Sequence, residues 1–230
     1  MDPAGGTADH PADRPGDHSP DRGQGRLRAD ARRNRDRIVA AATQAFAAQG
    51  ADVPVEEIAR AAGVGVGTVY RRFPDRDALI REVAQETMRA ALSQVRVAVT
   101  EEPTAWAALA RFLGQSRAMR LSVRLMMDSP DARATMADDP EICALRRAMM
   151  EVLDQVVQAA QAEGSLRADV GTGDVATAFV LLVRPLLLPD PDVASAALER
   201  CLGVMLDGLR AGSGSELPGA PLSRLDLGGP

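Results

Sequence analysis

Two short stretches with helical periodicity, separated by glycine, constrain this chain more than any other feature. In VEEIARAAG, apolar residues recur at i, i+3, i+4 and i+7, the spacing of one face of an α-helix: Val55, Ile58, Ala59 and Ala62. Gly63 follows the last of them. Glycine is common just after a helix because it enters the left-handed conformation without a Cβ penalty. The pattern predicts a short, packed helix that ends in a sharp turn.

A second short helix is predicted after Gly65, where we expect another change of chain direction. Val69 and Phe73 stand at i and i+4 and should face inward, and Pro74 ends the helix. Asp75 is expected to cap the helix that follows. The side opposite Val69 and Phe73 carries small and polar residues, with an aromatic residue at its flank: Gly67, Thr68, Tyr70, Arg71 and Arg72.

A third apolar stripe lies upstream and ends at Gly50; its members are Ile38, Val39, Ala42, Ala45 and Phe46. Three small helices can therefore share one core. Two helices joined by a tight turn, with a third packed on them, have the layout of a helix-turn-helix DNA-binding domain. In that layout the second helix of the pair lies in the major groove.

The charge of the chain is distributed unevenly, and the distribution is more informative than the total of -5. Residues 26–81 hold eleven Arg and seven acidic residues, a net charge of +4. Residues 82–230 hold fourteen Arg and twenty acidic residues, a net charge of -6, and residues 1–25 have a net charge of -3. A cationic segment joined to an acidic remainder is expected if only the N-terminal domain meets phosphate.

This N-terminal segment resembles the DNA-binding domain of the TetR (AcrR-type) family of bacterial transcriptional regulators. The resemblance rests on Ile38, Ala41, Phe46 and Gly50, followed in order by VEEIARAAGV, GTVYRRF and DRDAL. It covers roughly a quarter of the chain. The family commonly has Ser or Thr at the N-caps of its second and third helices, where this chain has Pro54 and Gly65. The resemblance implies a repressor that a small-molecule effector releases from a palindromic, double-stranded DNA operator.

The expected DNA contacts divide into three groups. Thr68, Arg71 and Arg72 should face the major groove, and the small Gly67 should allow close approach. The resemblance implies that Tyr70 and Arg76 bind phosphate. Arg28 and Arg35 belong to an arginine cluster at the start of the first helix and could reach the DNA backbone or the adjacent minor groove. The alternative for all of these residues is an ordinary solvated surface.

The rest of the chain is expected to be helical, so the predicted fold class is all-α. We expect an N-terminal three-helix domain at residues 26–81 and a larger helical effector-binding and dimerisation domain at residues 82–210. Residues 1–25 are rich in Asp, Pro and Gly and are expected to be disordered. Residues 211–230 are expected to form a flexible tail. Predicted helices include 75–99, 104–127 and 192–210, with Asp174 capping a helix over 176–188.

The last two predicted helices carry more apolar surface than one chain should leave exposed. ATAFVLLVRPLLL is apolar on all sides, and the final helix has a broad apolar stripe. In the TetR family the last two helices pair with their copies in a second subunit as a four-helix bundle. The homodimer interface expected here consists of Phe179, Leu182, Leu186, Leu198, Leu202, Met205 and Leu209. A dimer would hold two DNA-binding domains at a spacing of about 34–36 Å, one turn of DNA.

The resemblance also implies an effector site between helices of the larger domain, for a small molecule that the sequence does not identify. Arg184 lies within an apolar stretch just before Pro185, so it needs a partner. It could pair across the dimer, extend to the surface or bind an anionic effector. The other residues of the expected pocket could equally be plain core: Trp106, Phe112, Met119, Met126, Met149, Met150 and Phe179.

An enzyme is not expected. GVGVG departs from the dinucleotide-binding GxGxxG pattern because Thr68 takes the place of the third glycine, and a helix rather than a strand precedes it. All 27 basic residues are Arg, so there is no catalytic lysine, and the two histidines, His10 and His18, stand in the N-terminal segment. No cofactor or metal site is therefore predicted.

The sequence also bears on location. The longest apolar run is far shorter than the roughly twenty residues of a membrane span, and no signal peptide is visible. We therefore expect a cytoplasmic protein without membrane partners. The alternative function is a helical protein-interaction module or ligand sensor that has lost specific DNA binding.

Overall fold

The computed structural model describes residues 20–114, 121, 125, 130–184, 190–212 and 214–227, with side chains from residue 29 onward except that of residue 191. This part of the chain is helical and contains no strand, only an isolated bridge between Leu166 and Arg210. The predicted all-α class is therefore confirmed. The helices are α1 (Pro20–Gln49), α2 (Val55–Ala62), α3 (Val66–Arg72), α4 (Arg76–Glu101), α5 (Ala105–Gly114), α7 (Pro130–Ala137), α8 (Pro140–Ala162), α9 (Thr172–Leu182), α10 (Pro191–Leu209) and the 3-10 helix η1 (Arg224–Leu227).

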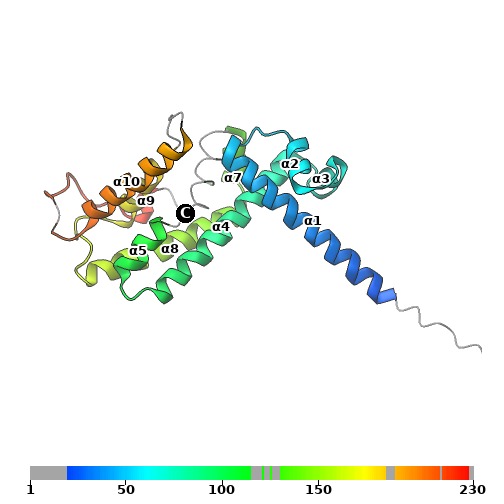
Figure 1. Ribbon diagram of the computed structural model, residues 1–230. Coiled ribbons are helices and arrows are strands. Elements are labelled where there is room, and N and C mark those ends of the chain that lie inside the picture. The colour runs from blue at the N-terminus through cyan, green and yellow to red at the C-terminus, as the bar shows by residue number, and fades with distance from the viewer. Residues whose placement is uncertain are drawn as a thin grey trace, which may run out of the picture.

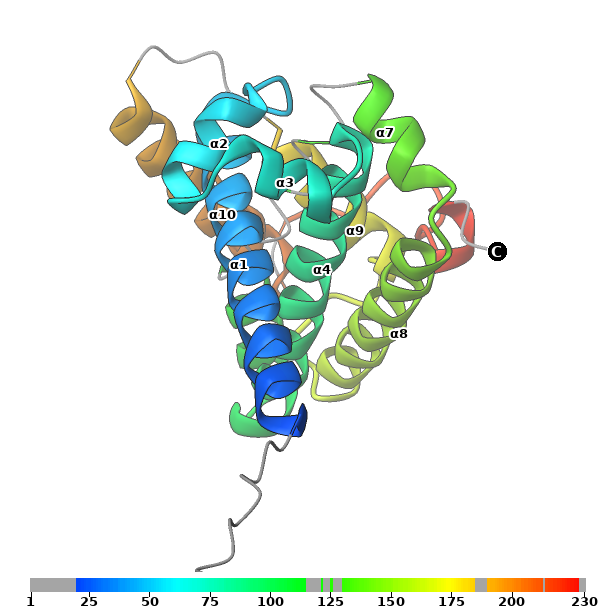
Figure 2. The same cartoon turned by 90° about the vertical axis from the view of Figure 1, so that its right-hand side faces the viewer.

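The helices form two groups that share α4 (Figure 1). At one end, α1, α2 and α3 pack together, and the N-terminal half of α1 extends away from the molecule. At the other end, α5 and α8 pack on α4, α9 packs on α8, and α10 packs on α5 and α9. Helix α4 packs on α1 at one end and on α8 along its length, and Figure 2 shows α2 and α3 above it. None of the helices in the described ranges is long and apolar enough to span a membrane.

The first core joins α1, α2 and α3 to the start of the larger domain. Ile38 and Phe46 of α1 meet Ile58 of α2 and Val69 of α3, as the apolar spacing predicts. The same core continues beyond the three small helices, because buried residues of α4, α7 and α8 complete it: Leu79, Ile80, Val83, Met136 and Ile142.

The second core fills the larger domain. It contains buried side chains from the second half of α4 and from α5, α8 and α9, among them Leu92, Leu109, Leu153 and Val175. The described part of the predicted helix 104–127 consists of α5 and, beyond the gap at 115–120, the helical residues Leu121 and Leu125. Asp174 is not an N-cap as predicted. Helix α9 begins earlier, after Gly171, and Asp174 stands in its first turn.

Gly63 is required at the turn after α2. Its φ is +63°, in the left-handed region, and its backbone closes α2 as the sequence predicts. Arg37 of α1 donates from Nη2 to the Gly63 carbonyl at 3.0 Å, and a Cβ added at Gly63 would lie 2.6 Å from that nitrogen. Gly65 differs from the expectation, because its φ of -72° is open to any residue. No side chain caps α2 or α3, whereas Asp75 accepts from the Ala78 N–H at the start of α4.

The ends of the chain differ from the sequence predictions. Helix α1 begins at Pro20, within the segment expected to be disordered, and proline suits the first turn of a helix. Residues 214–227, expected to be a flexible tail, lie against the larger domain instead. Hydrogen bonds from Arg167 and to Asp169 and Asp174 help to hold this segment, so its conformation depends on side chains far away in the sequence.

Replacement of Gly63 by Ala should lower the free energy of unfolding by about 1–2 kcal/mol, the cost of a left-handed conformation in a residue with a Cβ. Urea denaturation followed by circular dichroism would measure it. The matched control is Gly67→Ala, which should cause no loss, because its Cβ would meet no atom within 4 Å and Ala favours a helix. Equal stability of wild type and Gly63→Ala would contradict the prediction.

Candidate nucleic-acid interface

Helix α3 presents one face to solvent because two apolar side chains hold the other. Val69 and Phe73 are buried in the first core, so α3 has the inner and outer sides that its sequence predicts. The outer side carries the exposed Gly67, Tyr70, Arg71 and Arg72, with Thr68 half-buried beside them.

The polar groups on this face orient one another. Arg71 donates from Nη2 to the Thr68 hydroxyl at 3.0 Å, across one turn of the helix. Tyr70 is 47% exposed. The face thus offers hydroxyl, phenol and guanidinium groups, which bind phosphates and base edges in protein–DNA interfaces.

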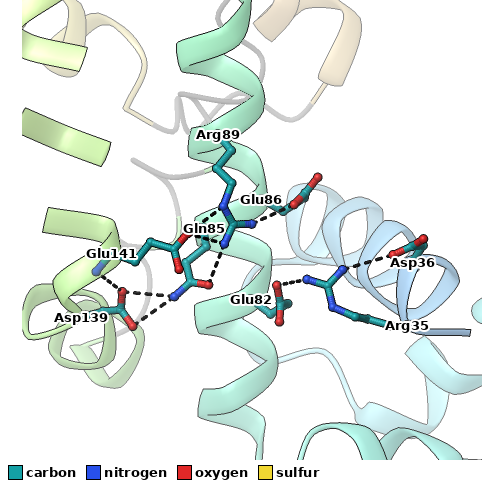
Figure 3. Close-up of polar contacts among 8 residues, drawn as sticks. All are labelled: Arg35, Asp36, Glu82, Gln85, Glu86, Arg89, Asp139 and Glu141. Carbon is teal, nitrogen blue, oxygen red and sulfur yellow. Dashed lines mark hydrogen bonds and ion pairs between the residues drawn. The ribbon is translucent and has the colours of Figure 1, made fainter. Parts of the chain in front are cut away.

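Two of the other candidate DNA contacts also connect helices within the chain. Arg35 of α1 forms ion pairs with Asp36 and with Glu82 of α4 (Figure 3). Arg76, at the start of α4, donates from Nη2 to the Ala51 carbonyl between α1 and α2. DNA contacts by Arg35 and Arg76 stay predictions. Arg28 stands on α1, and its side chain lies outside the described residues.

A polar network that sequence reasoning missed connects α4 to the start of α8 (Figure 3). Gln85 donates to Asp139, whose carboxylate also accepts from backbone N–H groups in the first turn of α8. One turn further along α4, Arg89 donates to Glu141 at 2.8 Å and to Glu86 at 2.9 Å. These contacts fix the middle of α4 against the larger domain.

Among the described residues, Arg89 is the one cation of this network and lies between two carboxylates. Burial by itself would lower the pKa of the Arg89 guanidinium, but hydrogen bonds and charge from Glu141 and Glu86 raise it above the ordinary value. The Arg89 guanidinium therefore stays charged over the physiological range. The sequence gives no signal of it, because Gln85 and Asp139 are 54 residues apart.

Two protein-family models match this chain. The family model "Bacterial regulatory proteins, tetR family" matches residues 38–83, and "Transcriptional regulator SbtR-like, C-terminal domain" matches residues 104–211. A TetR transcription regulatory protein from Mycobacterium vanbaalenii is 36% identical, with a TM-score of 0.54, over 80% of this chain and 99% of that one. A TetR transcriptional regulator from Streptomyces coelicolor is 33% identical, with a TM-score of 0.60, over 78% and 99%. The chain belongs to the TetR family.

This TetR-family chain is therefore a DNA-binding transcriptional regulator, of a class whose members are generally not enzymes. More distant structures share the fold alone. One of them is the transcriptional regulator FadR from Bacillus subtilis in complex with stearoyl-CoA, which is 17% identical, with a TM-score of 0.55, over 77% of this chain and 98% of that one. No curated protein matches the chain at a significant level.

The residues predicted to line an effector pocket gather in the second core of this TetR-family fold. Phe112 and Phe179 stack with ring centroids 6.5 Å apart, and Met149 is buried in the same core. Trp106 and Met150 pack against it half-buried. Two further members of the predicted set lie outside the described residues: Met119 and Met126.

The exposure of Arg184 agrees with one of the three alternatives, extension to the surface, and a role at a dimer or effector site stays a prediction. Helix α9 ends at Leu182, and Arg184 is exposed. Helix α9 ends here for a local reason. A residue that precedes a proline is disfavoured in the α conformation, and Arg184 precedes Pro185. Burial falls instead on Arg146 of α8, where it lowers the pKa of the guanidinium.

Two surface hollows on the larger domain are lined by other residues. One, of about 470 Å³, lies between α4 and α8 and is lined by Arg89, Leu92, Ser93, Arg96, Val97, Thr100 and Leu145. The second, of about 360 Å³, lies where α4 and α5 meet α8 and includes Val99, Ala108 and Val156. The location of an effector site stays a prediction.

Five of the seven residues predicted to form the dimer interface lie in or against the chain's own second core. Phe179 and Leu209 are buried in the second core, and Leu198, Leu202 and Met205 pack half-buried against it. Leu182 is half-buried, and Leu186 lies outside the described residues. The outer faces of α9 and α10 instead expose Val180, Leu181, Val193 and Val204. The dimer interface itself stays a prediction.

Replacement of Arg76 by Ala should lower the free energy of unfolding by about 1–3 kcal/mol, because the Ala51 carbonyl would lose its donor in a buried turn. Urea denaturation measures the change. Arg72→Ala is the matched control and should leave stability unchanged, since Arg72 is exposed. If Arg76→Ala weakened DNA binding without any loss of stability, the contact to Ala51 would have no structural role.

Proposed function

We propose that this TetR-family regulator represses transcription by binding a near-palindromic operator as a homodimer, and that a small molecule bound in the larger domain releases it. The observation that carries the DNA-binding part is the outer face of α3. There Thr68, Arg71 and Arg72 stand together on a helix held by Val69 and Phe73. The net charge of +4 over residues 26–81, in a chain of -5, supports the same assignment.

The contacts on DNA follow from the chemistry of this face. An arginine binds guanine best through two parallel N–H groups, and a threonine can either hydrogen-bond to a base or touch a thymine methyl. We assign these roles to Arg72 and Thr68, with Gly67 allowing the helix to come close. Tyr70 is placed at a phosphate, because a phenol at the flank of a recognition helix lies over the DNA backbone.

The homodimer is proposed through the outer faces of α9 and α10. Gly203 and Gly208 lie in the second half of α10, are exposed, and would leave a new Cβ without any atom within 4 Å. Glycine inside a helix costs about 1 kcal/mol relative to Ala. Among the described residues, no side-chain packing accounts for that cost at Gly203, and close approach of another helix would. Val204, which follows Gly203 on α10, is 74% exposed, and Leu181 on α9 is 58% exposed. Both supply apolar contact.

Release by an effector requires a connection between the two domains, and α4 provides one. Its first half belongs to the first core and its second half to the second core. Gln85 and Arg89 tie it to the start of α8 (Figure 3). An effector that shifts α8 would therefore move α4 and the DNA-binding domain attached to it, changing the spacing of the two α3 helices in the dimer.

Arg72→Ala should weaken binding to the operator by about 1–3 kcal/mol, while binding to random DNA changes less. The measurement is a gel shift at fixed salt with DNA from upstream of the gene itself and with a scrambled duplex. Arg147→Ala, an exposed arginine on α8, is the control and should bind like wild type. Equal losses on both duplexes would make Arg72 a phosphate contact. Absence of any specific shift by the wild type would favour the protein-interaction module.

Leu181→Glu should raise the dissociation constant of the dimer at least about a hundredfold, because it places an unpaired carboxylate in an apolar interface. Sedimentation equilibrium measures this constant. Val97→Glu, an equally apolar exposed position on α4, should leave it unchanged. A dimer as stable as wild type in Leu181→Glu would contradict the proposed interface.

A further inference from the structure

The segment at residues 214–227, here called the C-terminal segment, is held to the larger domain by fixed polar contacts. Arg167 binds Asp169 through two hydrogen bonds of 2.6 and 2.7 Å and donates to the Ser215 carbonyl at 2.7 Å. Asp169 also accepts from the Leu217 N–H at 3.1 Å. The guanidinium of Arg167 holds the pKa of Asp169 well below its usual range, so this anchor is ionised at neutral pH.

A second anchor lies at the start of α9. The carboxylate of Asp174 accepts from the N–H groups of Gly171 at 2.7 Å and Leu222 at 3.0 Å. Gly173 donates its N–H to the Leu222 carbonyl at 2.8 Å. The backbones are so close that a Cβ on Gly173 would lie 2.5 Å from the Ser223 carbonyl oxygen. The start of α9 therefore accommodates this segment only because glycine stands there.

The C-terminal segment extends a layer formed by the last two helices. Helix α10 packs on α5, α9 packs on α8 and on α10, and η1 packs on α9. Figures 1 and 2 agree in placing α10 and η1 on opposite sides of α9. We call α10, α9 and the C-terminal segment the outer layer; it covers one side of the second core.

Exposed apolar side chains are concentrated on this outer layer. Of the eleven large hydrophobic side chains that are exposed in the described part of the chain, eight lie on it. Four belong to α9 and α10 and four to the C-terminal segment, where Leu225 is 67% exposed. The anchors use backbone groups of this segment and leave its leucines outside: Leu217, Leu222, Leu225 and Leu227.

Helices α9 and α10 alone offer little exposed apolar surface for an interface. Their exposed faces hold four large apolar side chains among charged residues such as Asp192, Glu199, Arg200 and Asp207. Interfaces of permanent homodimers bury about 2,000 Å² or more and are more apolar than the rest of the surface. The leucines of the C-terminal segment double the number of large apolar side chains on the same layer.

We propose that the C-terminal segment forms part of the interface with a second copy of this chain, its leucines packing on the outer layer of the partner. The proposal rests on the homodimer proposed above. Because the segment is already held in place by Arg167, Asp169 and Asp174, it adds contact without the entropy cost of ordering a free tail on association.

The test is the dissociation constant of the full-length dimer, measured by sedimentation equilibrium. The double variant Leu225→Glu with Leu227→Glu changes exposed side chains and leaves every anchor intact, and it should raise the constant at least about tenfold. Val97→Glu, on α4, controls for an added carboxylate at an exposed apolar position and should not change it. In a gel shift, the double variant should bind the operator more weakly than wild type and Val97→Glu. Its operator binding should recover at higher protein concentration.

A second variant reaches the segment by another route. Gly173→Ala should displace the segment through the clash with Ser223, while Ala favours the helix itself. Hydrogen exchange should show the Leu222 amide losing protection, and the dimer should weaken about as much as in the double variant. Wild-type dimer stability in both variants, with the segment displaced in Gly173→Ala, would overturn the proposal.

The outcomes separate this inference from the proposed function. If Leu181→Glu breaks the dimer and the double variant does not, α9 and α10 suffice, and the C-terminal segment has no part in the interface. A monomeric wild type would refute the dimer and this inference together. If the double variant leaves the dimer intact but abolishes binding of another protein to the purified dimer, the leucines serve a different partner, and the proposal is wrong.

Discussion

The whole molecule depends on the burial of one continuous helix in two cores. Ile80 and Val83 of α4 lie in the first core with the DNA-binding helices, and Leu92 and Val95 lie in the second core with α5, α8 and α9. A helix is stiff over this length, so movement of either end is transmitted to the other. The orientation of α3 is therefore not independent of the packing of the larger domain.

Polar contacts decide how firmly each part is attached to that helix. Arg35 and Arg76 connect the start of α4 to α1 and to the turn before α2, and Gln85 and Arg89 connect its middle to α8. On α3, by contrast, Tyr70 and Arg72 are exposed and Arg71 bonds to Thr68 of the same helix. In the larger domain, backbone and carboxylate groups likewise hold the C-terminal segment, and its leucines are left exposed.

Much of the DNA-binding domain could be predicted because its signals are local. The i, i+3, i+4 spacing of α2, the glycine at its end and the cap at Asp75 depend on neighbours within a few residues. The sides of α3 follow from Val69 and Phe73 in the same way. The dimer face stays a prediction, because Leu198 and Leu202 look the same in sequence whether they pack on their own chain or on a partner.

By itself, the sequence determined the all-α class, the helix-turn-helix and the residues on its outer face, since helical periodicity and glycine conformation act over single turns. Only the tertiary structure decided which cations are held inside the domain, where α9 begins and that residues 214–227 are docked. Those outcomes depend on pairs such as Arg167 with Ser215 and Gly173 with Leu222, which lie 48 or 49 residues apart. Proximity of that kind is created by the packing of the chain, and no local pattern encodes it.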